Sequence, residues 1–289
     1  MAYSSPDAFL AHVLGTFRPY LDRLVLVGGF AVRLYERHPR ATPARIRVLR
    51  TFDADLAAPG ALSPESAPGL AVLANGAGFM TDLRGDHTPP VMKFVPKESA
   101  ASGSEQYTVE FLVPLTGPPA KRSGEPLATR AIQPGVTAQC MRYLDLLLVD
   151  SWPVPIAALP GIPDDCKEAL VRLPHPGLFV VQKILIARDR QDKRAKDMAY
   201  IYQVLSLFSQ DIPRLAREVW ARMEAIRTWR KWLKRFSQEG GEFFSSPGAA
   251  GVTDAYRILQ AEMTGLGGEA DTPTRAMIYA GVHAFLDHF

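Results

Sequence analysis

The apolar positions of the chain change their spacing about halfway along the sequence. The first half holds short apolar or alternating runs of strand length, and these lie at 24–29 (LVLVGG), 45–58 (RIRVLRTFDADLAA), 91–95 (VMKFV), 106–115 (QYTVEFLVPL) and 143–156 (YLDLLLVDSWPVPI). Helical spacing appears in this half at 7–20 and 30–38. From residue 177 onwards helical spacing dominates, interrupted by a loop expected at 240–251 (GGEFFSSPGAAG).

The two patterns meet in a proline-rich segment. Six prolines fall between 153 and 176, and proline interrupts both helices and central strands. We therefore expect an α/β domain over 1–160 and a helical domain over 161–289. This order predicts an α+β fold, in which a mixed β-sheet with flanking helices is followed by a C-terminal helical domain. The Gly-, Pro- and Ser-rich stretches 97–105 and 116–126 are expected to be loops.

Two aspartates lie one residue apart in the run TFDAD (51–55). Alternate residues of a strand point to the same side, so Asp53 and Asp55 would share a face with Thr51. Two neighbouring carboxylates repel each other unless a cation lies between them, and Mg²⁺ is held by one or two carboxylates with waters and phosphates. The pair therefore predicts a metal site. An exposed edge strand or a loop end would explain the same residues without a metal.

Two more features of the first half have both a functional and a structural interpretation. LVGG (26–29) predicts a strand that enters a turn and then a helix, where Gly28 and Gly29 would let backbone N–H groups approach a phosphate. Turn geometry alone explains the same glycines, and the third glycine of a dinucleotide-binding fingerprint is missing. Glu110 lies among the apolar residues of 106–115. It is a candidate third metal ligand, or else a carboxylate at the rim of the sheet.

The helical half carries a second group of charged residues. Lys183 is flanked by apolar residues, and Arg190, Arg194 and Asp197 follow it at +7, +11 and +14. An unbroken helix would place all four on one face, whereas a break near 189–192 would separate them. Cations in this position are suited to neutralise a triphosphate. The alternative is an ordinary solvated helix face.

The segment 214–235 is strongly basic, with eight Lys or Arg residues against two Glu. An apolar stripe at helical spacing runs through it and consists of Leu215, Val219, Met223, Ile226, Trp229 and Leu233. The stripe predicts a core-facing side, and the cations a solvated side. A surface that contacts the phosphates of tRNA or another nucleic acid is the alternative, with Trp220 and Trp232 stacking on bases if they are exposed.

Composition narrows these interpretations only a little. The 289 residues are 47% apolar and 22% charged, as in ordinary globular proteins, and the net charge is only +3. Two cysteines fit a reducing cytosol, and we see neither a signal peptide nor a run of about 18 apolar residues. We therefore expect a cytoplasmic protein without a membrane partner. The His, Ser and Cys residues suggest neither a metal site nor a catalytic nucleophile.

The order of these features is more specific than any one of them. A strand, a Gly-Gly turn and a helix come first, then Thr-x-Asp-x-Asp, a carboxylate on a later strand, a helical Lys and an Arg…Lys-Asp segment. This order resembles the nucleotidyltransferase superfamily typified by DNA polymerase β. Within it, the chain resembles the AbiEii/MenT-type proteins, many of which are toxins of bacterial toxin–antitoxin systems. The resemblance spans about residues 22–205.

The resemblance implies roles for the residues that match the family's motifs, namely the turn at Gly28 and Gly29, the metal-binding strand with Thr51, Asp53 and Asp55, the helical Lys183, and the segment with Arg190, Lys196 and Asp197. Two Mg²⁺ ions are implied at the two aspartates, with Glu110 as the third carboxylate. The glycine turn, Lys183 and Arg190 would bind the triphosphate, and Asp197 would orient Lys183 or the ribose. The implied reaction moves a nucleotide from an NTP such as ATP, at a site between the two domains.

The sequence departs from the family pattern in three places. Gly29 stands where the family usually has serine, and Tyr200 replaces the last acidic residue of the usual Lys-Asp-x-x-Asp. In addition, 23 residues separate Gly29 from Asp53, which is a longer gap than usual and requires an inserted loop or ribbon at RHPRATPARIRV.

The acceptor and the partners follow only from the resemblance. It implies RNA, with tRNA as one candidate, or a protein as acceptor, and an antitoxin protein as a partner. Two other interpretations stay open. One is a nucleotide- or nucleic-acid-binding regulatory module that has lost catalysis, and the other is a transferase that modifies a small molecule, as antibiotic nucleotidyltransferases do.

Overall fold

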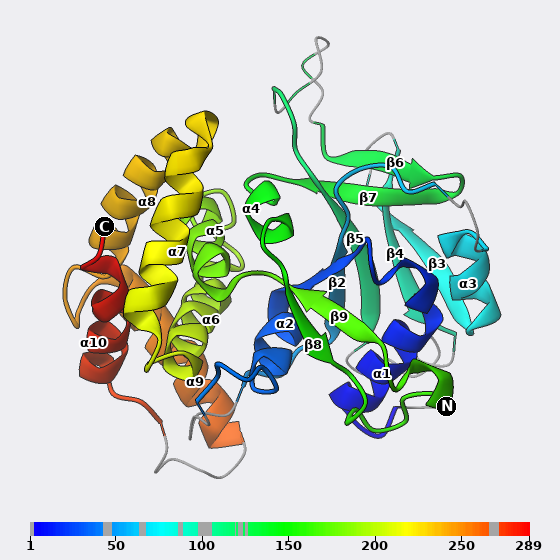
Figure 1. Ribbon diagram of the computed structural model, residues 1–289, viewed down its shortest axis with the longest axis horizontal. Helices are drawn as coiled ribbons and strands as arrows, with labels where there is room; N and C mark the ends of the chain where they lie inside the picture. Colours follow the sequence, from blue (N-terminus) through cyan, green and yellow to red (C-terminus); the bar gives the residue numbers. More distant parts are fainter. Residues whose placement is uncertain are drawn as a thin grey trace. The chain divides into compact units, whose positions relative to one another are not determined.

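The chain forms two compact units in the computed structural model, which describes residues 3–42, 48–63, 68–85, 89–97, 106–118, 120, 124, 127–265 and 272–289. Met1–Ala31 and Arg50–Pro174 make up the first unit, and Val32–Leu49 and His175–Phe289 the second (Figure 1). The division at Pro174 falls inside the proline-rich segment. Most of the expected loops 97–105 and 116–126 lies outside the described residues.

The first unit is built on a mixed nine-stranded sheet. Its strands are β1 (Val25–Val27), β2 (Asp53–Ala57), β3 (Phe79–Arg84), β4 (Val91–Pro96), β5 (Thr108–Pro114), β6 (Thr129–Gln133), β7 (Val136–Met141), β8 (Trp152–Pro155) and β9 (Leu170–Leu173). They follow the order β3-β4-β5-β2-β1-β9-β8, while β7 pairs with β5 and β6 with β7. The central strand β2 is antiparallel to β1 and parallel to β5. With the helices around the sheet and those that follow it, this confirms the predicted α+β fold.

The helices of the first unit are α1 (Pro6–Thr16), the part of α2 (Gly28–Tyr35) up to Ala31, α3 (Leu70–Gly76) and α4 (Asp145–Leu148). The Ser5 hydroxyl caps α1 by accepting a hydrogen bond from the Ala8 N–H (3.1 Å). Phe9 of α1 is fully buried and lies against Phe30 of α2, with ring centroids 5.9 Å apart. Phe17, just after α1, meets Phe111 of β5 edge to face at 5.3 Å. Aromatic packing thus joins α1 to the strand–turn–helix and to the middle of the sheet.

Two predicted elements are only partly correct, because the strand region 143–156 contains β8 but also a helix, and the loop 240–251 is confined to 244–249. The run 144–149, expected as a strand, contains the short helix α4 between two residues with positive φ, Tyr143 (59°) and Asp150 (51°). An apolar run of this length does not distinguish a buried strand from a buried helical turn, and the two left-handed residues confine it to one turn. Helix α8 continues to Phe243 and so includes the first four residues of the expected loop 240–251. Gly240 stays helical there and lets α8 pack closely against Leu286, since a Cβ on Gly240 would lie only 2.8 Å from Leu286 Cδ2.

The second unit is a bundle of helices, and these are α5 (Pro176–Ile186), α6 (Arg194–Leu207), α7 (Ile212–Ala225), α8 (Arg230–Phe243), α9 (Ala250–Gly265) and α10 (Arg275–Leu286). Helix α6 packs against α5, α9 and α10 and is buried on nearly all sides. Helices α7 and α8 are amphipathic. Their predicted apolar stripe is buried at every position except the half-buried Ile226, which confirms the core-facing interpretation. Among the described helices, none has the length and apolar character required to cross a membrane.

The described ends of the insert between α2 and β2 belong to the second unit and contact helix α6. The Thr42 N–H donates to the Leu207 carbonyl at the end of α6 (2.7 Å). The Leu49 N–H donates to Gln203 Oε1 on the same helix (3.5 Å). Residues 43–47 of the insert lie outside the described part of the chain.

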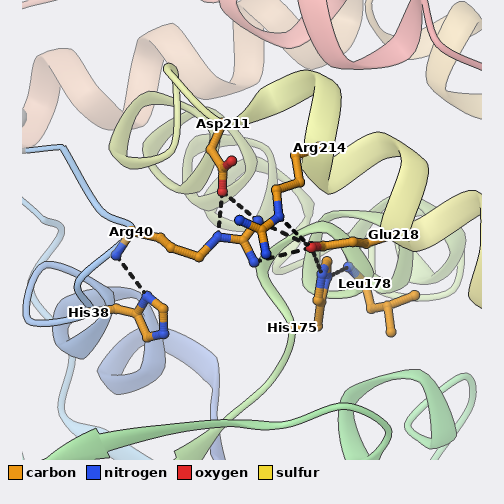
Figure 2. A network of polar contacts seen from close by, with 7 residues as sticks. All are labelled: His38, Arg40, His175, Leu178, Asp211, Arg214 and Glu218. Carbon is orange, nitrogen blue, oxygen red and sulfur yellow. Dashed lines mark hydrogen bonds and ion pairs between the residues drawn. The ribbon is translucent and has the colours of Figure 1, made fainter.

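Arg40 makes the main side-chain contact of this segment (Figure 2). Its Nε donates to Asp211 Oδ2 (2.5 Å), and its two terminal nitrogens donate to the two carboxylate oxygens of Glu218 (3.3 and 3.1 Å). Glu218 lies on α7, and Asp211 directly precedes that helix. A two-pronged contact from a guanidinium to a carboxylate is among the stronger side-chain hydrogen bonds.

Glu218 accepts hydrogen bonds from three side chains. Besides Arg40, these are Arg214 Nε (2.9 Å) and His175 Nε2 (2.9 Å) (Figure 2). His175 caps α5 by accepting from the Leu178 N–H at Nδ1, so its proton lies on Nε2 and points to Glu218. Partial burial alone would raise the pKa of Glu218, but the hydrogen bonds from His175, Arg40 and Arg214 hold it below its ordinary value.

Candidate active site

The central strand β2 presents two carboxylates on one face. Asp53 and Asp55 are half-buried, whereas Ala54 and Leu56, which alternate with them, are fully buried. One face of the strand therefore packs in the core, and the other carries the aspartates. Thr51 is buried and lies just before the strand begins.

Strand β5 adds polar side chains on the same face. In the parallel register, Asp53 lies opposite Thr108 and Asp55 lies opposite Glu110. The Thr108 hydroxyl donates to Asp53 Oδ1 (2.6 Å), which fixes one oxygen of that carboxylate. Glu110 is only 7% exposed, so three carboxylates gather on two neighbouring strands.

The charged partner of Glu110 is a residue that sequence reasoning missed. Lys93 lies opposite Glu110 in the antiparallel register of β4 and β5, and its Nζ forms an ion pair with Glu110 Oε1. The Lys93 side chain is 19% exposed. A single cation inside the apolar run VMKFV was the available signal, but the pairing depends on a strand register that one sequence does not provide.

The turn between β1 and α2 approaches the aspartates directly. Gly28 has a φ of +69°, a conformation that side chains rarely adopt. A Cβ on Gly28 would lie 3.2 Å from Asp55 Cγ and closer still to Oδ2. Glycine is therefore required here twice, for the backbone conformation and for the space taken by Asp55. Gly29 is buried in the first turn of α2.

The predicted residues of the helical half gather in the second unit. Lys183 Nζ donates to Asp197 Oδ1 (2.7 Å), and both side chains are less than a tenth exposed. Arg190 lies at the edge of the pair, with Nη1 3.9 Å from Asp197 Oδ2. Lys183 also lies over the ring of Phe179, 5.3 Å from its centroid.

The chain breaks between these residues rather than continuing as one helix. Helix α5 ends at Ile186 and α6 begins at Arg194, so the break considered for 189–192 is present. It still brings Lys183 and Asp197 together, because α5 and α6 pack side by side. Arg194 is not part of the pair and contacts Asp254 of α9 instead (2.8 Å).

The remaining motif positions lie on α6. Lys196 Nζ lies over the ring of Tyr200, 5.7 Å from its centroid. Tyr200, which stands where the family pattern has an acidic residue, is 4% exposed and part of the core of the second unit. The structure thus brings the candidate residues together in two sets, with Gly28, Asp53, Asp55 and Glu110 in one unit and Lys183, Arg190 and Asp197 in the other.

The first set fits Mg²⁺ through its two aspartates. Magnesium uses one or two protein carboxylates and takes its other ligands from water and phosphate. Within the described part of the chain, no three His, Cys, Asp or Glu side chains are grouped closely enough to hold a metal by themselves. The third carboxylate, Glu110, is held by Lys93. Asp53 and Asp55 are therefore the residues that could hold the ion.

The basic segment 214–235 is partly neutralised, since Arg214 pairs with Glu218 and Arg230 with Glu224 inside the segment, and Arg235 pairs with Glu239 just after it. Several other cations are exposed, namely Arg217, Arg227, Lys231 and Lys234. They lie on α7, on α8 or on the turn between these helices. A solvated basic surface therefore exists on this unit.

The two tryptophans proposed for stacking differ in exposure. Trp220 is 44% exposed and lines a pocket of about 440 Å³ together with Arg230, Lys234 and Phe289. Trp232 is half-buried and stacks on Trp229, with ring centroids 5.6 Å apart. Trp220 is therefore more accessible than Trp232.

A comparison with protein families gives a match over most of the chain. The model of a family described as Nucleotidyltransferase matches residues 11–225, a range that includes both sets of candidate residues. Searches of the curated proteins and of the solved structures found no match. The match supports nucleotide transfer in general, and the closer resemblance to AbiEii/MenT-type proteins stays a prediction.

Proposed function

Because the chain belongs to the nucleotidyltransferase family whose model matches residues 11–225, we propose that it transfers a nucleotide from an NTP to an acceptor in a Mg²⁺-dependent reaction. The observation that carries the proposal is the arrangement on β2. Asp53 and Asp55 share one face, Asp55 is in register with Glu110, and the positive-φ Gly28 makes room for the Asp55 carboxylate. Neither packing nor turn geometry alone requires this combination.

The residues of the first unit would bind the metal and the reacting phosphates. Asp53 and Asp55 would hold Mg²⁺, with Glu110 as the third carboxylate for a second ion. Bound Mg²⁺ would favour ionisation of the acceptor hydroxyl and neutralise charge on the departing pyrophosphate. The backbone at Gly28 and Gly29 begins a helix and would place N–H groups near the triphosphate.

The residues of the second unit would supply positive charge. We assign Lys183 and Arg190 to neutralisation of the triphosphate and Asp197 to orientation of Lys183, which it already contacts. The acceptor oxygen would bond to the α-phosphorus while the bond from that phosphorus to the β-phosphate oxygen breaks. Positioning and charge stabilisation would supply most of the rate enhancement.

We propose RNA, with tRNA as the first candidate, as the acceptor class and a protein as the alternative. The exposed cations of α7 and α8 and the half-exposed Trp220 favour RNA, because phosphates and unstacked bases are bound by such side chains. Action as a toxin with an antitoxin partner follows from the AbiEii/MenT-type resemblance and is part of the same proposal.

A second candidate function is a nucleotide-binding regulatory module without catalysis. Two observations favour it: Gly29 lacks the usual serine hydroxyl, and the buried Tyr200 takes the place of an acidic residue. Modification of a small molecule is a third candidate, since the pair of aspartates would serve any hydroxyl acceptor.

The test is transfer of label from each of the four α-labelled NTPs, with Mg²⁺ and either total tRNA, cell lysate or small-molecule acceptors. Asp53→Asn and Asp55→Asn each keep the side-chain shape and should reduce transfer by more than about 100-fold. Asp82→Asn is the control, because Asp82 lies on β3 of the same sheet and pairs with Arg84 (2.6 Å). Intact nucleotide binding with no transfer to any acceptor would favour the regulatory module.

A further inference from the structure

The ion pair between Lys93 and Glu110 places a positive charge where the proposed reaction needs a metal ion. Lys93, Glu110 and Asp55 lie in register on the neighbouring strands β4, β5 and β2, so their side chains share one face of the sheet. Asp53 lies on the same face, two residues before Asp55. An ammonium group is thus part of the carboxylate cluster.

Burial explains why Glu110 has such a partner. The residue is 7% exposed, and a carboxylate at that depth without a counter-ion destabilises the fold by several kcal/mol. Lys93 supplies the counter-ion that the structure records for Glu110, and it does so from the adjacent strand without disturbing the sheet. The charge of Glu110 is in this way neutralised in the metal-free protein.

A divalent cation at Asp55 would meet that ammonium as a like charge. The Glu110 carboxylate is the group that both cations would contact, and repulsion between them at such short range disfavours simultaneous binding. We propose that Lys93 is a positioning residue, which neutralises Glu110 in the metal-free protein and must leave it before Glu110 can bind a metal ion. This inference rests on the proposed function, because it assumes that the aspartates of β2 bind a metal.

The consequence is that Lys93 weakens metal binding in the absence of nucleotide. Removal of its charge should leave Glu110 without a partner and make the site more attractive to a divalent cation. The effect must act through Glu110, since this is the carboxylate that Lys93 contacts. A lysine that only supported the fold would instead leave the metal affinity unchanged or lower it.

The experiment measures Mn²⁺ binding to the full chain without nucleotide, from the electron paramagnetic resonance signal of free Mn²⁺. Lys93→Gln should tighten Mn²⁺ binding by about tenfold, the size expected when a partly buried ion pair no longer competes. Lys93→Arg keeps the charge and should bind as the wild type does. Lys97→Gln is the matched control, because Lys97 is exposed and lies just after the same strand.

Lys93→Gln is also tested in a Glu110→Gln background. This comparison separates competition between Lys93 and the metal ion for Glu110 from a general effect of the lysine charge on metal binding. Lys93→Gln should then produce no further tightening. Equal tightening in both backgrounds, or no tightening in the Lys93→Gln variant while its thermal unfolding matches the wild type, overturns the inference. Unchanged Mn²⁺ binding after Asp53→Asn with Asp55→Asn overturns the proposed function as well. Loss of binding in that double variant, with no effect of Lys93→Gln, overturns the inference alone.

Discussion

The close approach of Gly28 to Asp55 predicts how a single methyl group would affect the site. In a Gly28→Ala variant, the new Cβ would lie 3.2 Å from Asp55 Cγ, which is tighter than most Cβ contacts, and it would lie closer to Asp55 Oδ2 than Cβ atoms approach other atoms in proteins. The carboxylate oxygen would have to move by roughly 1 Å to restore an ordinary contact. Alanine at a φ of +69° also destabilises the fold by about 1 kcal/mol.

The strained backbone and the displaced Asp55 carboxylate affect different measurable quantities. We expect the free energy of unfolding to fall by about 1–3 kcal/mol, from the backbone conformation and the residual crowding. We expect nucleotide transfer to fall by about 100-fold, because a displacement of about 1 Å in a catalytic group has effects of that order. Urea denaturation measures the first quantity, and transfer of label from an NTP measures the second.

Gly78→Ala is the matched control for the backbone effect. Gly78 has a φ of +83°, and nothing lies within 4 Å of a Cβ placed on it. This variant should lose about 1 kcal/mol of stability and keep its activity. Equal activity in the two variants, with equal loss of stability, would show that Gly28 serves only the turn and does not determine the position of Asp55.

Three further predictions concern the second unit. Arg40→Gln removes two acidic contacts and should lower the free energy of unfolding by about 1–3 kcal/mol, with Arg37→Gln as a neutral control in urea denaturation. The pKa of Glu218 lies below its ordinary 4.5 in the folded protein, so its contribution to stability is complete above that value and disappears as the pH falls through the folded pKa. Wild type should therefore exceed Glu218→Gln in stability at pH 7 and approach it as the pH falls through the lowered pKa of Glu218. Lys183→Met should lower the free energy of unfolding by about 3 kcal/mol, because the buried Asp197 carboxylate would keep only the more distant Arg190 (3.9 Å) as a counter-ion, and Lys183→Met with Asp197→Leu should recover most of that loss. Equal stability of the wild type and Lys183→Met would contradict burial of the pair.

The sequence was informative wherever local spacing determines structure. The alternation in TFDAD places Asp53 and Asp55 on one face whatever the strand's neighbours are, because strand geometry repeats every two residues. The apolar stripe from Leu215 to Leu233 predicts a buried side for the same kind of reason. In the run 144–149 local spacing fails, because five apolar residues around Asp145 fit a buried strand and a buried helical turn equally well.

Contacts that depend on tertiary pairing could not be read from one sequence. Lys93 and Glu110 are 17 residues apart, and they meet only because β4 and β5 pair in one particular register. The helix break between Lys183 and Asp197 was one of two open possibilities, and the packing of α5 on α6 decides it. The role of Arg40 depends in the same way on Asp211 and Glu218, which lie more than 170 residues further along the chain.

The long gap between Gly29 and Asp53 illustrates how register, rather than loop length, determines the geometry of the site. Strands β1 and β2 are antiparallel, and Asp55 lies opposite Val27, the residue just before the glycine turn. That pairing brings Asp55 to Gly28 however many residues connect α2 to β2. The described ends of the connecting segment contact the second unit through Arg40, Thr42 and Leu49 and belong to that unit. The insertion that distinguishes this chain from the family pattern is therefore compatible with an unchanged arrangement of glycine and aspartates.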